Sequence, residues 1–190
     1  MSNGSIIQDF LEEANGRMNK SVEATRGEFA TVRTGRASPH LLDRIQVDYY
    51  GAATPLRQLA NIATPEARLL SITPYDKSSI KSIEKAILES DVGLTPSNDG
   101  QIIRLVIPEL TEERRRELVK IVHRLAEEGR VSVRNVRRDV MHDLRELKNE
   151  GEVGADDEHR AEAELQKLTD ARIGEIDAAL ANKEQEILEV

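Results

Sequence analysis

The chain has 190 residues, of which 38% are hydrophobic and only 3% aromatic, so an aliphatic core of helices packed on helices is favoured. The net charge of −8 argues against a generic nucleic-acid-binding protein, and the absence of Cys excludes disulfides, thiolate zinc sites and cysteine nucleophiles. The N-terminus lacks a signal peptide's apolar stretch, and no segment approaches the roughly 18 apolar residues of a membrane span, so we expect a cytoplasmic protein.

The N-terminal segment predicts a long amphipathic helix. Its apolar positions recur at steps of three and four residues, which places them on one stripe. The stripe consists of Ile7, Leu11, Ala14, Met18, Val22, Thr25, Phe29 and Val32. The pattern stops near Thr34-Gly35, and Ser38-Pro39 supports a break there.

Residues 37–107 have a different texture and predict a small α+β module. Three strands are predicted from alternating or β-branched residues that end at Gly or Pro. They are residues 45–49, 69–72 and 101–107. A short helix is predicted between the second and third strands, because Ile80, Ile83 and Ile87 have helical spacing; it begins at about residues 78–79.

Helical periodicity returns after Leu110, where Thr111 is a candidate N-cap. The second long stripe ends at Gly151, a candidate C-terminal cap. It consists of Leu118, Val122, Leu125, Val133, Val136, Val140, Leu144 and Leu147. A third helix is predicted after Gly154, with Asp156 or Asp157 as its cap. Its stripe consists of Ala161, Leu165, Leu168, Ile176, Leu180 and Ile187. A three-helix bundle buries all three stripes together.

The module therefore interrupts the bundle. We expect a bundle domain of residues 1–34 and 109–190, and a module of residues 37–107, in an elongated two-domain body. Two segments of chain join the domains, and both contain proline. A module on two such linkers is expected to move as a unit about a hinge. The hinge residues are predicted to be Thr34, Gly35, Arg36, Pro39 and Pro108.

No motif indicates catalysis. The four His residues are scattered without an HExxH pair, and neither a phosphate-binding Gly-Lys-Ser/Thr loop nor a GxGxxG pattern occurs. A Ser-His-Asp site assembled from distant residues stays open, but no nucleophile-elbow motif points to one. We therefore expect a protein that is not an enzyme and has neither a cofactor nor a metal site.

The charge is distributed unevenly along the chain. Residues 114–138 contain nine basic residues and three acidic ones, a net charge of +6, whereas residues 151–190 contain four and twelve, a net charge of −8. On a helical wheel, seven basic side chains fall within about one third of the circumference, beside the apolar sector. They are Arg116, Lys120, Arg130, Arg134, Arg137, Arg138 and Arg145. One guanidinium group can donate two parallel hydrogen bonds to a phosphate and can also stack on a base. This stripe therefore favours folded RNA as the partner.

A plainer interpretation of the same stripe is a solvated helix face. Glu127 lies within it, and carboxylates of the acidic third helix could pair with some of its arginines. A general RNA-binding module and a coiled-coil scaffold without an RNA partner also stay open.

Several strings of residues resemble the bacterial ribosome recycling factor family. They occur in order from about Phe10 to the C-terminus. They are residues 32–39 (VRTGRASP), 47–51 (VDYYG), 54–60 (TPLRQLA), 84–87 (EKAI), 90–94 (SDVGL), 110–115 (LTEERR), 133–139 (VRNVRRD) and 166–170 (QKLTD).

This resemblance implies an L-shaped protein, with a three-helix bundle interrupted by a β/α/β sandwich module. It implies a monomeric translation factor that binds the large ribosomal subunit after termination and acts with elongation factor G to separate the subunits and release the messenger RNA. The ribosomal RNA contacts expected from the stripe and the resemblance are Arg115, Arg130, Arg134, Arg137 and Arg138. Arg33 and Arg36, beside the linker, are weaker candidates.

Overall fold

The computed structural model describes residues 3–189. The bundle domain expected from the sequence also included residues 1–2 and Val190, which lie outside the described residues. The chain divides into two compact units. One takes in the chain up to Val32 together with Glu113–Leu188, and the other runs over Arg33–Glu112.

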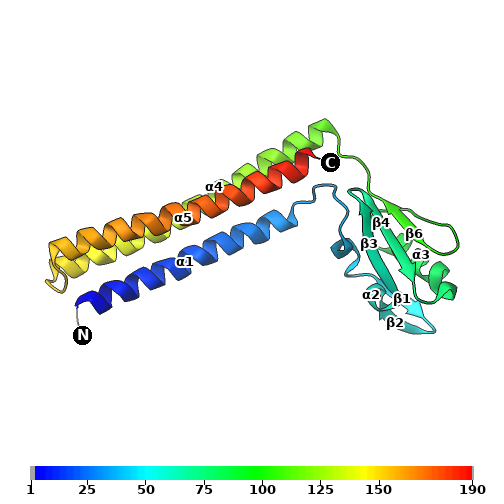
Figure 1. Cartoon of the computed structure of the whole chain (residues 1–190), viewed down its shortest axis with the longest axis horizontal. Coiled ribbons are helices and arrows are strands. Elements are labelled where there is room, and N and C mark those ends of the chain that lie inside the picture. Colours follow the sequence, from blue (N-terminus) through cyan, green and yellow to red (C-terminus); the bar gives the residue numbers. More distant parts are fainter. Residues whose placement is uncertain (1–2, 190) are drawn as a thin grey trace. The chain divides into compact units, whose positions relative to one another are not determined.

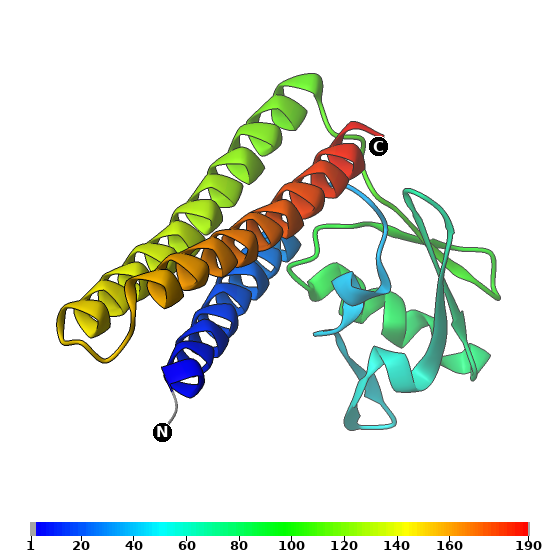
Figure 2. The same cartoon turned by 60° about the vertical axis from the view of Figure 1, so that its left-hand side comes forward.

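The first unit is a bundle of three long helices, α1 (Asn3–Thr31), α4 (Glu112–Asn149) and α5 (Ala155–Leu188). They lie side by side, with α4 running opposite to the other two (Figures 1 and 2). Each helix buries most of the stripe that its periodicity predicts, because an apolar residue every third or fourth position faces the same neighbours. Leu125, Leu147 and Leu168 are only half-buried, whereas Ala126 and Thr169, which were not predicted, are buried. Fully buried members include Met18, Val22, Val122, Val133, Leu144, Leu165 and Ile176. The predicted fold class, a helix bundle interrupted by an α+β module, is confirmed.

The turn between α4 and α5 follows the predicted C-terminal cap. Gly151 has a φ of +77°, its N–H donates to Lys148 O, and the next N–H donates to Leu147 O, the pattern of a Schellman motif. The predicted N-cap of α5 was wrong. The helix begins at Ala155, one residue before Asp156, so the carboxylates lie in the first turn, where they still complement the helix dipole.

α1 and α4 approach each other closely at Gly129. A Cβ atom there would fall well inside van der Waals contact of Thr25 Oγ1 and 3.1 Å from Thr25 Cγ2. One turn away, the hydroxyls of Ser21 and Ser132 share a 2.7 Å hydrogen bond. Gly129 therefore serves packing rather than helix interruption, because only a residue without a side chain leaves room for Thr25.

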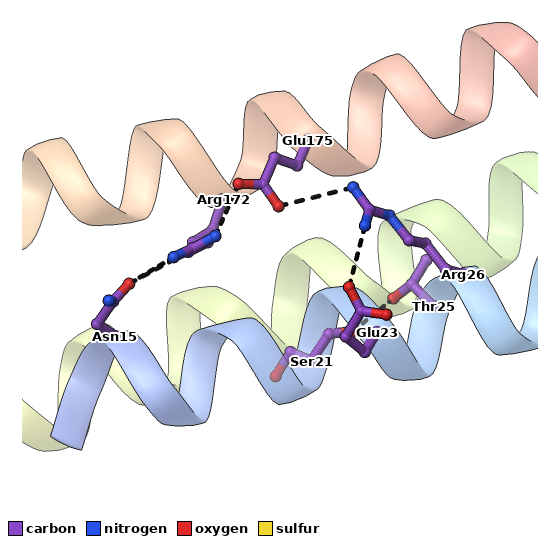
Figure 3. Close-up of polar contacts among 7 residues, drawn as sticks. All are labelled: Asn15, Ser21, Glu23, Thr25, Arg26, Arg172 and Glu175. Carbon is purple, nitrogen blue, oxygen red and sulfur yellow. Dashed lines mark hydrogen bonds and ion pairs between the residues drawn. The ribbon is translucent and has the colours of Figure 1, made fainter. Parts of the chain in front are cut away.

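A chain of polar contacts joins α1 to α5 (Figure 3). Arg172 donates to Asn15 Oδ1 through Nη2 at 2.7 Å and to Glu175 Oε1 through Nη1 at 2.7 Å. The other oxygen of Glu175 lies 3.8 Å from Arg26, which in turn bonds Glu23 at 3.0 Å. Surface ion pairs contribute little stability one by one, but these contacts fit only one alignment of the two helices.

The second unit contains a hairpin and a four-stranded antiparallel sheet. The hairpin pairs β1 (Gln46–Tyr49) with β2 (Ala52–Pro55), and the sheet has the order β3-β4-β6-β5. The sheet strands are β3 (Ala60–Glu66), β4 (Leu69–Pro74), β5 (Pro96–Asn98) and β6 (Ile103–Val106). The helical pieces are η1 (Pro39–Leu42), α2 (Leu56–Leu59), η2 (Lys77–Ser79) and α3 (Ile80–Glu89). The three predicted strands are present, whereas β2, β3 and β5 were not predicted.

The core of this unit lies between α3 and one face of the sheet. Ile83 and Ile87 of α3 are fully buried in the same cluster as Ile72, Ile103 and the other inward residues of the sheet. The helical segment begins earlier than predicted, because Asp76 caps η2 by accepting the N–H of Ser78.

We predict that Gly129→Ala lowers the free energy of unfolding by about 1–3 kcal/mol, because the added methyl overlaps Thr25 in a packed interface. Urea denaturation followed by far-UV circular dichroism measures the change. The matched control is Gly174→Ala in α5, where a Cβ meets no atom within 4 Å. This control should stabilise by about 0.5–1 kcal/mol through helix propensity alone. Equal stability of the two variants would show that the close contact is unimportant.

Candidate nucleic-acid interface

α4 has a buried aliphatic side and a cationic side. The side against the other helices carries Leu118, Val122, Ala126, Gly129, Val133, Val136, Val140 and Leu144. The opposite side carries basic residues that fall within about a quarter of the helix circumference. We call this set the cationic face: Arg116, Lys120, Arg124, Arg134, Arg138 and Arg145. Because the aliphatic side is buried, these side chains lie on the solvent side of α4, where Arg134 is half-buried and the others are exposed.

Members of the cationic face differ in how far they are neutralised. Within residues 3–189, the side chains of Lys120 and Arg138 are exposed and have neither a hydrogen bond nor an ion pair. Arg124 and Arg145 have only long contacts, at 3.9 Å to Glu128 and 3.7 Å to Glu162. Contacts of this length between exposed groups are weak and screened by salt.

A carboxylate holds two of the predicted RNA contacts together. Glu127 accepts from Arg130 Nη1 and from Arg134 Nη1, each at 3.0 Å. Arg130 also donates to Asp177 of α5, through Nε at 2.8 Å and Nη2 at 2.7 Å. We call these four residues the Glu127 cluster. The Arg130 side chain is only 19% exposed and lies against α5, whereas that of Arg134 is 38% exposed.

Protonation in the Glu127 cluster follows from these contacts. Hydrogen bonds from Arg130 and then Arg134 lower the pKa of Glu127 below its ordinary value. Burial works to lower the pKa of Arg130, but the hydrogen bonds with Asp177 and Glu127 outweigh it and raise that pKa. The two arginines therefore share one carboxylate that stays ionised at neutral pH.

Arg137 is held by a neutral partner. Its Nη1 donates to Gln166 Oε1 at 2.7 Å, and Gln166 Nε2 donates to Asp170 at 2.8 Å. Arg137 Nε is buried and has no hydrogen-bond partner within the described part of the chain. Because an amide carries no charge, Arg137 is oriented without being neutralised by its direct partner.

The structure thus does not treat the five predicted contacts alike. Arg138 is exposed, Arg134 and Arg137 are oriented and partly accessible, and Arg130 is turned toward α5. Arg115, near the start of α4, is half-buried and also has an interaction partner in the chain.

The predicted hinge residues lie where the chain enters and leaves the second unit. Ala37 N–H donates to Ala67 O at 2.7 Å, and Ile107 N–H donates to Arg68 O at 2.8 Å, so both segments are fixed at the turn between β3 and β4. Gly35 has a φ of +75°, and a Cβ there would lie 3.1 Å from Leu110 Cγ. The two linkers therefore touch each other.

The remaining predicted hinge residues have different surroundings. Thr34 is buried, whereas Arg36 and Pro108 are exposed. Pro39 is the first residue of η1, a turn capped by Ser38, and so belongs to a folded element.

Sequence reasoning noticed Glu127 within the stripe but did not find Asp177 or Gln166 as arginine partners. Both come from α5, and their pairing depends on how α4 and α5 are aligned. Within residues 3–189, no cluster of His, Asp and Glu could hold a metal ion, and no helix has the length and apolar character to cross a bilayer.

The fold and this interface define a class of protein, a helix bundle with an inserted α+β module and a cationic outer face on its middle helix. A family model described as ribosome recycling factor matches residues 25–188. The ribosome-recycling factor of Rubrobacter xylanophilus is 63% identical over 180 residues, which cover 95% of this chain and 97% of that protein. The chain belongs to the ribosome recycling factor family.

Two solved structures are similar over the whole chain. A solution structure of ribosome recycling factor has a TM-score of 0.71 at 43% identity and covers 97% of this chain and 98% of its own. The second is the ribosome recycling factor of T. thermophilus, described with E. coli elongation factor G bound to the E. coli post-termination complex. It has a TM-score of 0.62 at 45% identity and covers 99% of this chain and all of its own.

We predict that Arg134→Gln raises the pKa of Glu127 toward its ordinary value, because one of its two guanidinium donors is lost. A carboxyl-carbon NMR titration measures this directly. The pKa of Glu127 is depressed in the folded chain. Its contribution to stability is therefore present above the ordinary carboxyl pKa and lost as pH falls through the depressed value. Lys167→Gln on α5 is the control and should leave Glu127 unchanged. The same titration curve for Glu127 in wild type and Arg134→Gln would contradict the prediction.

Proposed function

We propose that this protein binds the post-termination ribosome through RNA of the large subunit and, with elongation factor G, promotes separation of the subunits and release of messenger RNA. The observation that carries the proposal is the line of outward basic side chains on α4, in a chain whose net charge is −8. Membership of the ribosome recycling factor family supports it, as does the T. thermophilus relative bound to a post-termination complex.

The first contact is electrostatic. Arg138 and Lys120 bring full, unpaired charges to the outer side of α4, so phosphate groups replace water rather than a protein carboxylate when they bind. Release of counterions from RNA then drives association and makes it sensitive to salt.

The second contact uses arginines that are already oriented. Gln166 holds Arg137, and Glu127 holds Arg134, so less side-chain freedom is lost when either group binds. Arg134 exchanges Glu127 for a phosphate, a modest cost because the pair is partly exposed. Arg130 bridges to Asp177 and contributes mainly by fixing the cluster. Arg115 extends the interface toward the start of α4.

The module is the moving part in this proposal. Both linkers are anchored to the β3–β4 turn, which leaves only residues 33–36 and 108–112 between the two units. Rotation at Gly35 and its neighbours carries the module as one body when the translocase acts. The proposed hinge comprises Thr34, Gly35, Arg36 and Pro108, with Pro39 at its edge.

In this proposal the protein binds and moves but makes and breaks no covalent bond. We therefore propose that it is a translation factor rather than an enzyme. It needs no cofactor, because hydrolysis of GTP belongs to elongation factor G. It acts as a monomer in the cytoplasm, where ribosomes are found.

We predict that Arg138→Gln weakens binding to large ribosomal subunits about tenfold and lowers the slope of log affinity against log salt by about 0.7–0.9. One phosphate contact and its released counterion are lost. Co-sedimentation with purified subunits across a salt series measures both quantities.

The control for this experiment is Lys167→Gln, which removes an exposed cation from the acidic helix α5. It should bind as the wild type does. Equal affinity and slope for Arg138→Gln and wild type would refute docking through this face. Equally tight binding of the wild type to unrelated duplex RNA would favour a general RNA-binding module instead.

We also predict that short Gly-Ser insertions after both Arg36 and Pro108 abolish subunit splitting while preserving binding to the large subunit. Looser linkers leave the cationic face intact but no longer transmit force between the units. Splitting is followed by light scattering with elongation factor G and GTP, and binding by co-sedimentation. The control places the same insertion between Gly151 and Glu152, in the turn that joins α4 to α5. Full splitting by the double-linker variant would remove the hinge from the mechanism.

A further inference from the structure

Two of the three tyrosines of the chain meet beside one carboxylate in the α+β module, and the third directly precedes that carboxylate in the sequence. The rings of Tyr49 and Tyr50 meet edge to face, with centroids 4.6 Å apart. Tyr49 Oη donates to Asp76 Oδ2 at 2.9 Å, and Tyr75 directly precedes Asp76. Tyr50 is 83% exposed and Tyr75 is 73% exposed. In a chain with no Trp and two Phe, this is an unusual concentration of exposed aromatic surface.

Tyr50 occupies a backbone position that disfavours it. β1 and β2 are joined by a two-residue loop, closed by the pair Tyr49 and Ala52. Tyr50 has a φ of +51° and Gly51 a φ of +82°, the signs that a type I′ turn requires. The first position of this turn favours Asn, Asp or Gly. Tyr50 is the one non-glycine residue with positive φ in the described part of the chain.

Packing within the chain does not compensate for this conformation. The Tyr50 ring has an edge contact with Tyr49, but most of the side chain faces solvent. A large aromatic side chain that stays exposed at a turn position that disfavours it is available to contact another molecule.

The carboxylates beside the tyrosine rings favour a partner with positive charge. Asp48 Oδ1 accepts the N–H of Gly51 at 2.9 Å, which places a carboxylate at the turn. Hydrogen bonds from the side chain and backbone of Ser78, then from Tyr49, lower the pKa of Asp76, so it is ionised at neutral pH. Carboxylates beside aromatic faces attract guanidinium and ammonium groups and repel phosphate. Lys77 follows Asp76 in the sequence, and Arg44 and Lys85 line one hollow together with Asp48, so Asp76, bonded by Tyr49, is the carboxylate that lies directly against a ring.

We propose that Tyr49, Tyr50, Tyr75, Asp48 and Asp76 form a docking surface for a protein segment that carries arginine or lysine. Cationic side chains of the partner stack on the exposed rings and pair with the carboxylates. We call this surface the tyrosine patch. It is independent of the cationic face on α4, whose charge is opposite in sign and suits RNA.

The tyrosine patch carries its own probe. Because the chain has no Trp, its intrinsic fluorescence comes from these three tyrosines. We titrate the full-length protein with a short peptide of alternating Arg and Gly, and separately with an oligouridylate of the same number of residues. All three tyrosines lie in the α+β module, so quenching that the patch variants weaken is assigned to the patch. We expect saturable quenching by the peptide and none by the oligouridylate.

Two variants test the assignment, and a third is the control. Tyr50→Asn restores a favoured turn residue, and Asp48→Asn keeps an acceptor for Gly51 N–H but loses the charge. Each should weaken peptide binding at least about threefold. Leu88→Gln removes another exposed apolar side chain of the same unit, on α3, and should bind like wild type.

The melting temperature distinguishes a role of Tyr50 in binding a partner from a role in folding. Tyr50→Asn should melt at the wild-type temperature or above it, because strain at the turn is relieved. A lower Tm would mean that Tyr50 is kept for folding and would overturn the proposal. So would quenching by the oligouridylate as strong as that by the peptide, the absence of saturable quenching, or equal affinity of the wild type and the two patch variants.

Discussion

The interface on this protein depends on the burial of one aliphatic line along α4. With almost no aromatic residues, each long helix fills the bundle with a narrow row of Leu, Ile, Val and Ala, and its remaining circumference must face solvent. Burial of Val133, Val136 and Val140 therefore determines where Arg134 and Arg138 point. A rotation of α4 that moved the arginines inward would expose this line, and would bury charges without partners. The same hydrophobic burial that stabilises the bundle therefore presents the cationic face.

Contacts between helices then adjust the charge of that face. Two sets of contacts fix the alignment of the three helices along their axes. One is the contact of Gly129 in α4 with Thr25 in α1, and the other is the polar chain through Arg172. That alignment brings Asp177 to Arg130 and Gln166 to Arg137. A carboxylate neutralises the first arginine, and an amide orients the second without cancelling its charge. The acidic helix α5 therefore neutralises part of the positive charge on α4 and leaves the rest exposed. A protein with a net charge of −8 can thus bind RNA through this face.

The two units divide recognition between them. The bundle has a long, regular cationic face suited to a polyanion, whereas the module has a compact aromatic surface with two carboxylates, suited to cationic protein groups. A factor that works between RNA and a partner protein gains from surfaces of opposite charge, because each repels the other's ligand. The two linkers are in contact with each other at Gly35 and Leu110.

The sequence by itself determined the three long helices and the class of fold, because helical periodicity is a local signal repeated over many turns. It also determined the family, through strings such as VRNVRRD at residues 133–139, and identified Arg138 as a candidate contact. Only the tertiary structure decided which arginines are neutralised by carboxylates of other residues and turned away from solvent. Pairing of Arg130 with Asp177 joins residues 47 positions apart, and no local pattern encodes such an alignment. The strands β2, β3 and β5, which lack a clear local signal, exist because neighbouring strands supply their hydrogen bonds. Tyr50 has a positive φ because the hairpin must close there.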